Sequence, residues 1–384
     1  MKIQLPDSRG QLQDYRLSGT PVIATKPTQP FNRIAYAAAH VVADPFAETT
    51  TAQSIAIDWD RTMAFRTHLL DLGFDIAEAM DTSQRGMGLD WPSALELINR
   101  SLDNAGEHAN RIASGCGTDQ LAASDARSLD DVVRAYLEQL HAIQKRGGRI
   151  ILMASRALVR VAQSPQDYLK VYASVLRECN QPAILHWLGD MFDPALKGYW
   201  GSNDFTEAVE TALAVIRENQ SKVDGIKISL LDAQKEIDMR RRLPATVKMY
   251  TGDDFNYPDL IAGDDKGFSH ALLGIFDCIA PVASSALAAL SAGDEGKYNK
   301  LMAPTIALSR RIFRAPTQNY KTGIVFLAWL NGHQDHFVMI NGAQSARSLS
   351  DFVDIFKLAD AADLLSDPHL AISRMNKLMS VYGL

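Results

Sequence analysis

The chain has 384 residues, of which 47% are hydrophobic and 22% are charged, and its formal net charge is −6. These values are ordinary for a globular protein and exclude a disordered, collagen-like or disulfide-stapled chain. The acidic balance provides no basic surface for nucleic acid or for an anionic membrane, so neither is an expected partner.

Short apolar runs predict strands that alternate with amphipathic helices along most of the chain. In chain order, the predicted strands cover residues 21–24, 74–77, 111–114, 149–153, 183–187, 223–228, 246–250 and 274–279. Apolar residues spaced three and four apart predict helices between several of these strands, at residues 91–102, 129–143, 165–175 and 205–216. Ser128 and Asp131 form a typical capping signal at the start of the second of these helices.

The strand–helix unit recurs about every 33 residues, and this alternation is typical of a parallel sheet covered by helices. Eight such units in about 270 residues suit a closed (β/α)8 TIM barrel. An open doubly wound sheet is the alternative, but the chain has no glycine-rich phosphate-binding motif that would favour it.

The alternation of strands and helices stops near residue 294. Beyond it the pattern predicts only helices, at residues 301–313, 323–330, 349–358 and 371–381. We therefore expect a barrel domain at residues 1–293, which includes a short N-terminal lead without clear periodicity, and a C-terminal helical extension at residues 294–384.

Cysteine usage and hydropathy predict a cytoplasmic protein. The three cysteines cannot all pair, and none lies in a Cys-x-x-Cys motif, which favours reduced thiols. Residues 1–10 are polar and lack the apolar core of a secretion signal. The most apolar stretch, residues 271–290, is interrupted by Asp277 and Pro281, so a membrane span is not expected.

Lys227 lies in the predicted strand at residues 223–228, where a buried parallel strand is normally apolar throughout. In a TIM barrel, functional side chains stand at the carboxyl ends of the strands and in the loops that follow. A lysine amine buried there has a lowered pKa and can attack a carbonyl carbon to form a Schiff base. The alternatives are a strand-end lysine that reaches solvent, and Lys248 in the next strand as the reactive amine.

The turn after the strand at residues 246–250 contains Gly252, Asp253 and Asp254. Glycine allows a tight turn and the close approach of a ligand, and the two carboxylates can orient substrate hydroxyls or a metal ion. Glycine–aspartate turns are also common without any function, so this motif alone leaves both interpretations open.

The segment that starts at the end of the strand at residues 183–187 and continues into the following loop is aromatic, and it contains His186 and Tyr199. It suits a substrate lid with a proton-transfer group, and equally a contact between subunits. The loop at residues 81–86 offers hydroxyls and one arginine, which suit an anionic ligand or an ordinary turn.

Several of these segments follow one another in a recognisable order. They are residues 73–76, the glycine-rich turn at 112–118, Gly225-Ile226-Lys227, residues 252–254 and residues 302–304. In this order they resemble the dihydrodipicolinate synthase and N-acetylneuraminate lyase superfamily of class I aldolases, and the chain looks like an uncharacterised bacterial branch of it. The resemblance spans residues 57–304 and implies a TIM barrel, a Schiff base at Lys227 and a homo-oligomer, either a dimer or a tetramer.

Two loops depart from the superfamily pattern. The superfamily has a Gly-Thr-Thr-Gly-Glu loop that holds a 2-oxoacid carboxylate, whereas this chain offers only the hydroxyls of Thr82 and Ser83. Asp81 beside them would repel a carboxylate unless Arg85 neutralised it. In place of the superfamily's proton-shuttling tyrosine the chain has His186, and Tyr199 in the same loop is the alternative.

The first hypothesis is a Schiff-base-forming lyase or aldolase that acts on a small carbonyl compound and needs no metal or other cofactor. Lys227 forms the iminium and His186 or Tyr199 moves the proton. The expected substrate-binding residues are Thr82, Ser83, Asp81, Gly252, Asp253 and Asp254. The alternatives are a barrel that binds a small ligand without turnover, and a metal-dependent hydrolase that uses Asp253, Asp254 and His186.

Overall fold

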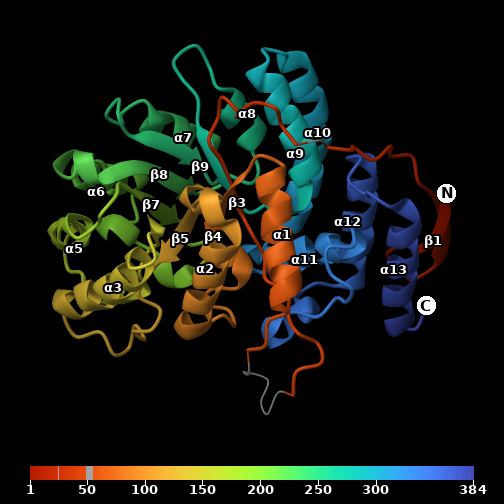
Figure 1. Cartoon of the computed structure of the whole chain (residues 1–384), viewed down its shortest axis with the longest axis horizontal. Helices are drawn as coiled ribbons and strands as arrows, with labels where there is room; N and C mark the ends of the chain where they lie inside the picture. The colour runs from red at the N-terminus through yellow and green to blue at the C-terminus, as the bar shows by residue number, and fades with distance from the viewer. Residues whose placement is uncertain (25, 49–54) are drawn as a thin grey trace. The chain divides into compact units, whose positions relative to one another are not determined.

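In the residues that the computed structural model describes, 1–24, 26–48 and 55–384, eight parallel strands close into a barrel (Figure 1). The strands are β3 (Ala35–Ala38), β4 (Asp75–Glu78), β5 (Ile112–Cys116), β6 (Arg149–Leu152), β7 (Ala183–Leu188), β8 (Val223–Ser229), β9 (Lys248–Thr251) and β10 (His270–Leu273). They pair in chain order, and β10 closes the barrel by pairing with β3, where Ala271 lies opposite Ala35. The predicted (β/α)8 TIM barrel with a C-terminal helical part is confirmed.

The chain divides into two compact units. The first, called here the barrel unit, comprises Arg33–Ala38 and Asp75–Leu273 and contains all the barrel strands. The second, called here the helical unit, comprises Met1–Asn32, Ala39–Phe74 and Gly274–Leu384. A domain boundary at residue 293 stays a prediction about which parts fold independently.

Most helices of the barrel unit begin at capping residues that the sequence makes visible. Asp90 accepts a hydrogen bond from the backbone N–H of Ser93, and Ser128 and Asp131 form a complete capping box. The helices are α2 (Trp91–Ala105), α3 (Leu129–Gln144), α4 (Arg156–Val161), α5 (Pro165–Arg177), α6 (Phe205–Glu218), α7 (Ala233–Arg240) and α8 (Tyr257–Ala262). The four helices predicted between the strands therefore form where periodicity and caps agree.

Two predicted strands are wrong. Residues 21–24 have no regular structure, and the first barrel strand is β3, whose Ala-Tyr-Ala-Ala sequence has little of the β-branched character typical of strands. Residues 274–279 contain the start of helix α9 (Phe276–Ser291), and the last strand, β10, ends just before them. One long apolar run encodes both β10 and α9, and such a run does not by itself distinguish a strand from a buried helix.

The helical unit contains the helices predicted beyond residue 294, together with a hairpin that the sequence did not predict. Its elements are β1 (Lys2–Pro6), β2 (Leu12–Arg16), α1 (Trp59–Asp71), α9, α10 (Glu295–Ile312), α11 (Tyr320–Leu330), α12 (Leu349–Ala361) and α13 (Pro368–Val381). β1 and β2 pair in antiparallel fashion, and β1 packs next to α12. Asp360 of α12 accepts hydrogen bonds from the Tyr15 hydroxyl (2.8 Å) and from the backbone N–H groups of Ser18 and Gly19.

Side chains fill the interior of the barrel. The buried cluster includes Tyr36, Ile151, Ile184, Tyr250 and Leu272, and the rings of Tyr36 and Tyr250 meet edge to face with centroids 5.9 Å apart. A TIM barrel filled in this way has no pore, so a ligand must bind at an end of the barrel rather than inside it. Among the described residues, no helix is both long and apolar enough to cross a membrane.

Candidate functional site

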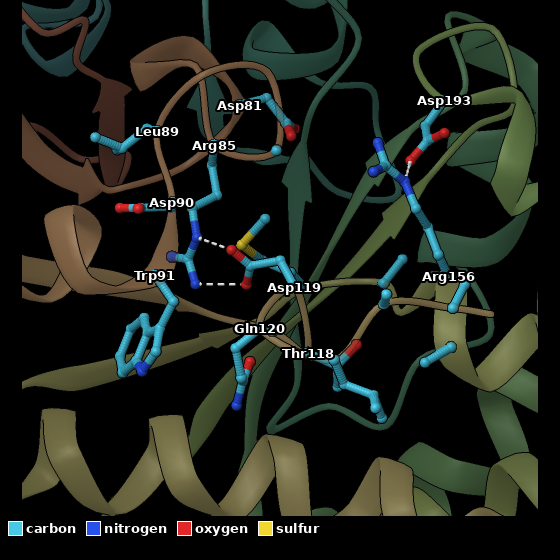
Figure 2. Close-up of a pocket in the computed structure, with 18 of the residues that line it drawn as sticks. Asp81, Arg85, Leu89, Asp90, Trp91, Thr118, Asp119, Gln120, Arg156 and Asp193 are labelled. Atoms are coloured by element: carbon cyan, nitrogen blue, oxygen red, sulfur yellow. Dashed lines mark hydrogen bonds and ion pairs between the residues drawn. The ribbon is translucent and has the colours of Figure 1, made fainter. Parts of the chain in front are cut away.

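A cavity of about 450 Å³ opens at the carboxyl ends of the neighbouring strands β4 to β7 (Figure 2). Its walls come from the loops after β4, β5 and β6 and from the end of β7 and the loop that follows it. They include Asp81, Arg85, Thr118, Arg156 and His186. Its volume is typical of a small-molecule site, and this end of a TIM barrel is where enzymes of the fold place their chemistry.

Lys227 lies near the carboxyl end of β8, next to the cavity. Its side chain is buried, with 7% exposure, and it forms no hydrogen bond or ion pair with any described residue. In the pairing of β7 with β8, Lys227 lies directly opposite His186, which lines the cavity. Burial lowers the pKa of Lys227, and the negative charges of Asp81 and Asp254 partly oppose this shift.

His186 is fully buried and takes part in a polar contact with β8. Its Nε2 lies 3.3 Å from the Oγ of Ser229, whereas its Nδ1 is buried without a partner among the described residues. Burial, and then the charge of Lys227, lower the pKa of His186 well below the usual value, so the ring is neutral at neutral pH. A neutral imidazole beside a hydroxyl can accept or donate a proton.

Sequence reasoning missed Ser229, although strand alternation places it on the same face of β8 as Lys227. Gly252 brings these two side chains close to one another. A Cβ atom at Gly252 would lie 2.3 Å from the Oγ of Ser229 and 2.7 Å from the Cε of Lys227. The predicted Gly252 therefore leaves space that the side chains of Lys227 and Ser229 both border.

Arg85 is not available to Asp81, contrary to one expectation from the sequence. Its guanidinium forms a two-pronged ion pair with Asp119, with both N···O distances at 2.7 Å (Figure 2). Burial alone would raise the pKa of Asp119, but the hydrogen bonds and charge of Arg85 hold it below its usual value. The remaining N–H groups of Arg85 donate to Gln139 Oε1, Ala79 O and Gly115 O. Five acceptors thus match its five N–H groups.

Arg156 and Asp193 form a second ion pair on the other side of the cavity (Figure 2). The Nε of Arg156 donates to Asp193 Oδ2 at 2.5 Å, and Asp193 Oδ1 accepts from the backbone N–H of Ala195 at 3.1 Å. The turn that begins at Asp193 therefore fixes the direction of the Arg156 side chain. Neither pair was predicted, because no local pattern links residues 34 or 37 positions apart in sequence.

The structure does not bring Tyr199 to the cavity wall. Its hydroxyl lies 2.8 Å from the hydroxyl of Tyr172 and accepts a hydrogen bond from the backbone N–H of Ser155 at 3.2 Å. Its ring packs against Tyr168 and Trp200. Burial raises the pKa of Tyr199, so this tyrosine holds its proton at neutral pH.

The other predicted substrate-binding residues have different surroundings. Ser83 is buried and its hydroxyl donates to the carbonyl of Met80 at 2.7 Å, and Thr82 is buried beside it. Asp253 Oδ1 accepts from the backbone N–H groups of Phe255 and Asn256, so this carboxylate holds the turn before α8. Burial raises the pKa of Asp253, and these hydrogen bonds oppose the rise.

Metal binding is not favoured by the arrangement of side chains. Within residues 1–24, 26–48 and 55–384, no three His, Cys, Asp or Glu side chains are grouped in a way that could hold a metal ion. Asp253, Asp254 and His186, which the sequence offers as possible ligands, do not form such a group.

Solved structures with a similar fold belong to the dihydrodipicolinate synthase family. Dihydrodipicolinate synthase from Bacillus anthracis aligns at 14% identity with a TM-score of 0.62, over 86% of this chain and 98% of that chain. A putative dihydrodipicolinate synthetase from Pseudomonas aeruginosa aligns at 16% identity with a TM-score of 0.64, over 86% and 99% of the two chains.

A third similar structure is YagE, a prophage protein of the dihydrodipicolinic acid synthase family from E. coli K12, solved in complex with pyruvate. It aligns at 15% identity with a TM-score of 0.64, over 87% of this chain and 99% of that chain. At these identities the likeness establishes the fold, and it confirms the resemblance predicted from the sequence at that level.

Sequence comparison gives the family itself. No curated protein matches the chain. A family model described as a protein of unknown function, DUF993, matches residues 3–384. The chain therefore belongs to the DUF993 family, and its barrel has the dihydrodipicolinate synthase fold.

Proposed function

We propose that the chain is a Schiff-base-forming enzyme of the lyase or aldolase type that acts on a small carbonyl compound through Lys227. The observation that supports this function most directly is the state of the Lys227 amine. It is buried beside the cavity, has no ion-pair partner among the described residues and has a lowered pKa. The dihydrodipicolinate synthase fold is consistent with this chemistry but does not establish it.

The reaction begins when the neutral amine of Lys227 attacks the carbonyl carbon of the substrate. A C–N bond forms, the carbonyl oxygen takes up protons and leaves as water, and an iminium remains. The iminium withdraws electrons from the neighbouring carbon, so that a C–C bond there can break or form.

His186 is the better candidate for moving protons in this mechanism. Its neutral ring lines the cavity and reaches the Ser229 hydroxyl, which shares a strand face with Lys227. The Tyr199 hydroxyl is engaged by Tyr172 and by the Ser155 backbone. We therefore assign the acid–base role to His186 acting with Ser229.

The test is reductive trapping. The purified protein is incubated with a panel of small aldehydes and ketones and sodium cyanoborohydride, and the modified peptide is identified by mass spectrometry. We expect a single adduct, at Lys227, and its loss in Lys227→Met. Lys248→Met is the matched control, because Lys248 lies on the adjacent strand and is paired with Asp224 at 2.7 Å.

A folded wild-type protein that forms adducts only at other lysines, or at none with any member of the panel, contradicts the proposal. Such a result favours a barrel that binds its ligand without turnover. If a folded Lys227→Ala variant still binds the ligand, the protein is a binding barrel without turnover, and the missing adducts are not due to unfolding.

A further inference from the structure

The cationic side chains that line the cavity are already neutralised by the protein. Arg85 is paired with Asp119, and Arg156 is paired with Asp193. The two other aspartates on the lining, Asp81 and Asp90, form no ion pair with any described residue. The cavity wall therefore has a net negative charge, which is unfavourable for an anionic substrate.

The charge of Asp81 limits which substituent the substrate can carry beside its reacting carbonyl. It begins the turn after β4, lines the cavity, and is near enough to Lys227 for its charge to act on that amine. Its carboxylate accepts no hydrogen bond from the described residues. A carboxylate placed beside a carbonyl at Lys227 would meet this like charge, whereas a hydroxyl there would donate a hydrogen bond to it.

Two of the groups that could hold a carboxylate at this position have acceptors within the protein. The hydroxyl of Ser83 donates to the carbonyl of Met80, and all N–H groups of Arg85 have acceptors within the protein. The open polar groups near the amine are the Asp81 carboxylate, which is an acceptor, and the buried Nδ1 of His186, which has no partner among the described residues.

From this arrangement, and resting on the proposed function, we infer that the substrate is an uncharged hydroxy-aldehyde or hydroxy-ketone. The carbon next to its carbonyl bears a hydroxyl and is not the carbon of a carboxylate. The hydroxyl donates to Asp81. Further hydroxyls of a longer substrate reach the Arg156–Asp193 pair. The Arg156 N–H groups that bond to no described residue donate to them, and the Asp193 carboxylate accepts.

Hydroxyacetone and pyruvate test this inference, because they have the same three-carbon methyl ketone skeleton and differ in the group beside the carbonyl. With either probe, the Lys227 amine replaces the carbonyl oxygen, which leaves as water. Cyanoborohydride then delivers a hydride to the carbon of the C=N bond, and the nitrogen keeps a proton from water. The fraction of Lys227 modified is measured at equal probe concentration and pH.

We expect hydroxyacetone to modify Lys227 at least about tenfold faster than pyruvate in the wild type. In Asp81→Asn, which keeps the side-chain size but removes the charge, this ratio falls about tenfold, chiefly because pyruvate reacts faster. Asp204→Asn is the charge-matched control. Asp204 caps α6 and does not line the cavity, and asparagine caps equally well, so this variant stays folded and the ratio stays as in the wild type.

The outcomes separate the inference from the function on which it rests. If pyruvate modifies Lys227 as fast as hydroxyacetone, or if Asp81→Asn leaves the ratio unchanged, the substrate class is wrong while Schiff-base chemistry stands. If hydroxyacetone does not modify Lys227, the inference is overturned. The proposed function fails as well only if the full panel of carbonyl compounds also leaves Lys227 unmodified.

Discussion

The two ends of the barrel differ in whether their lysine side chains have partners. At the carboxyl end, Lys227 is buried without a partner among the described residues. At the amino end, Lys248 on the adjacent strand donates to Asp224 at 2.7 Å. The amino end has the satisfied polar groups of a structural region, whereas the carboxyl end retains groups that have no partner among the described residues.

At the amino end, the ion pair of Lys248 with Asp224 is part of a larger hydrogen-bond network. The Tyr250 hydroxyl donates to the second oxygen of Asp224 at 2.7 Å, and Arg149 donates to the Tyr36 hydroxyl at 2.7 Å. Burial opposes ionisation of Asp224, but the hydrogen bonds from Lys248 and Tyr250 lower its pKa below the usual value. At the carboxyl end, by contrast, the Nδ1 of His186 and the carboxylate of Asp81 remain unpartnered by the described residues.

The prediction with the largest expected effect on stability compares two glycines, one near each end of the barrel. A Cβ atom at Gly252 would lie 2.6 Å from the carbonyl oxygen of Ile228, and one at Gly225 would lie 2.6 Å from that of Lys248. Because backbone atoms move little in a packed barrel, we expect each alanine variant to lose about 3 kcal/mol of unfolding free energy. Denaturant unfolding measures this loss.

The two glycine variants differ in chemistry. Gly252→Ala also displaces the Lys227 side chain, so its trapping rate per folded molecule falls at least about tenfold. Gly225→Ala traps at the wild-type rate, because its added methyl group meets only the amino end. If the trapping rate at Lys227 falls equally in the two folded variants, the claim that only the carboxyl end takes part in the chemistry is wrong.

A second, smaller effect should distinguish the two lysines by stability alone. Lys248→Met leaves the carboxylate of Asp224 without its closest cation, and we expect a loss of about 2 kcal/mol in unfolding free energy. Lys227→Met removes a desolvated amine that has no ion pair to lose, so its stability equals or exceeds that of the wild type. A greater loss in Lys227→Met than in Lys248→Met would show that the unpartnered lysine has a structural role.

The sequence predicts the parts of this molecule that depend on local patterns. Helix α3 combines a capping box with a long apolar stripe, and its prediction is confirmed almost to the residue. Strand β3 has only alanine and one tyrosine to mark it, and its position depends on pairing with β10 and β4. The hairpin β1–β2 was missed for the same reason, since its register comes from partners rather than from periodicity.

In the candidate site, too, the sequence predicts what depends on local patterns and misses what depends on contacts between distant segments. The place of Lys227 near the end of a strand follows from counting along the chain, and alternation correctly puts Lys248 and Tyr250 on one face, where both reach Asp224. The pairing of Arg85 with Asp119 depends on where two loops meet, which no spacing in the sequence encodes. The acceptor-rich character of the cavity becomes visible only once such pairs are known.

The smallest expected effect concerns His270, which begins β10 at the amino end. Its Nδ1 accepts the backbone N–H of Ile34 at 2.9 Å, so the fold requires this nitrogen to be unprotonated. Burial, followed by the charges of Lys248 and Arg33, lowers the pKa of His270 to about 4, and Asp224 partly opposes the shift. The stability that depends on neutral His270 is fully present above the unfolded pKa of about 6.5 and is lost as pH falls towards 4.

Between pH 7.5 and 5.5 this group alone should remove about 1.4 kcal/mol of unfolding free energy, because each unit below the unfolded pKa costs about that amount. His270→Gln keeps an acceptor for the Ile34 N–H group but does not titrate, so its stability should fall less than that of the wild type over this range. Trapping at Lys227, compared at one pH, should be unchanged, since His270 begins β10 and does not line the cavity. If the unfolding free energies of the two proteins fall equally with pH, folding does not lower the pKa of His270. The polar groups of the amino end would then not be held in fixed hydrogen bonds, and the contrast with the carboxyl end would be wrong.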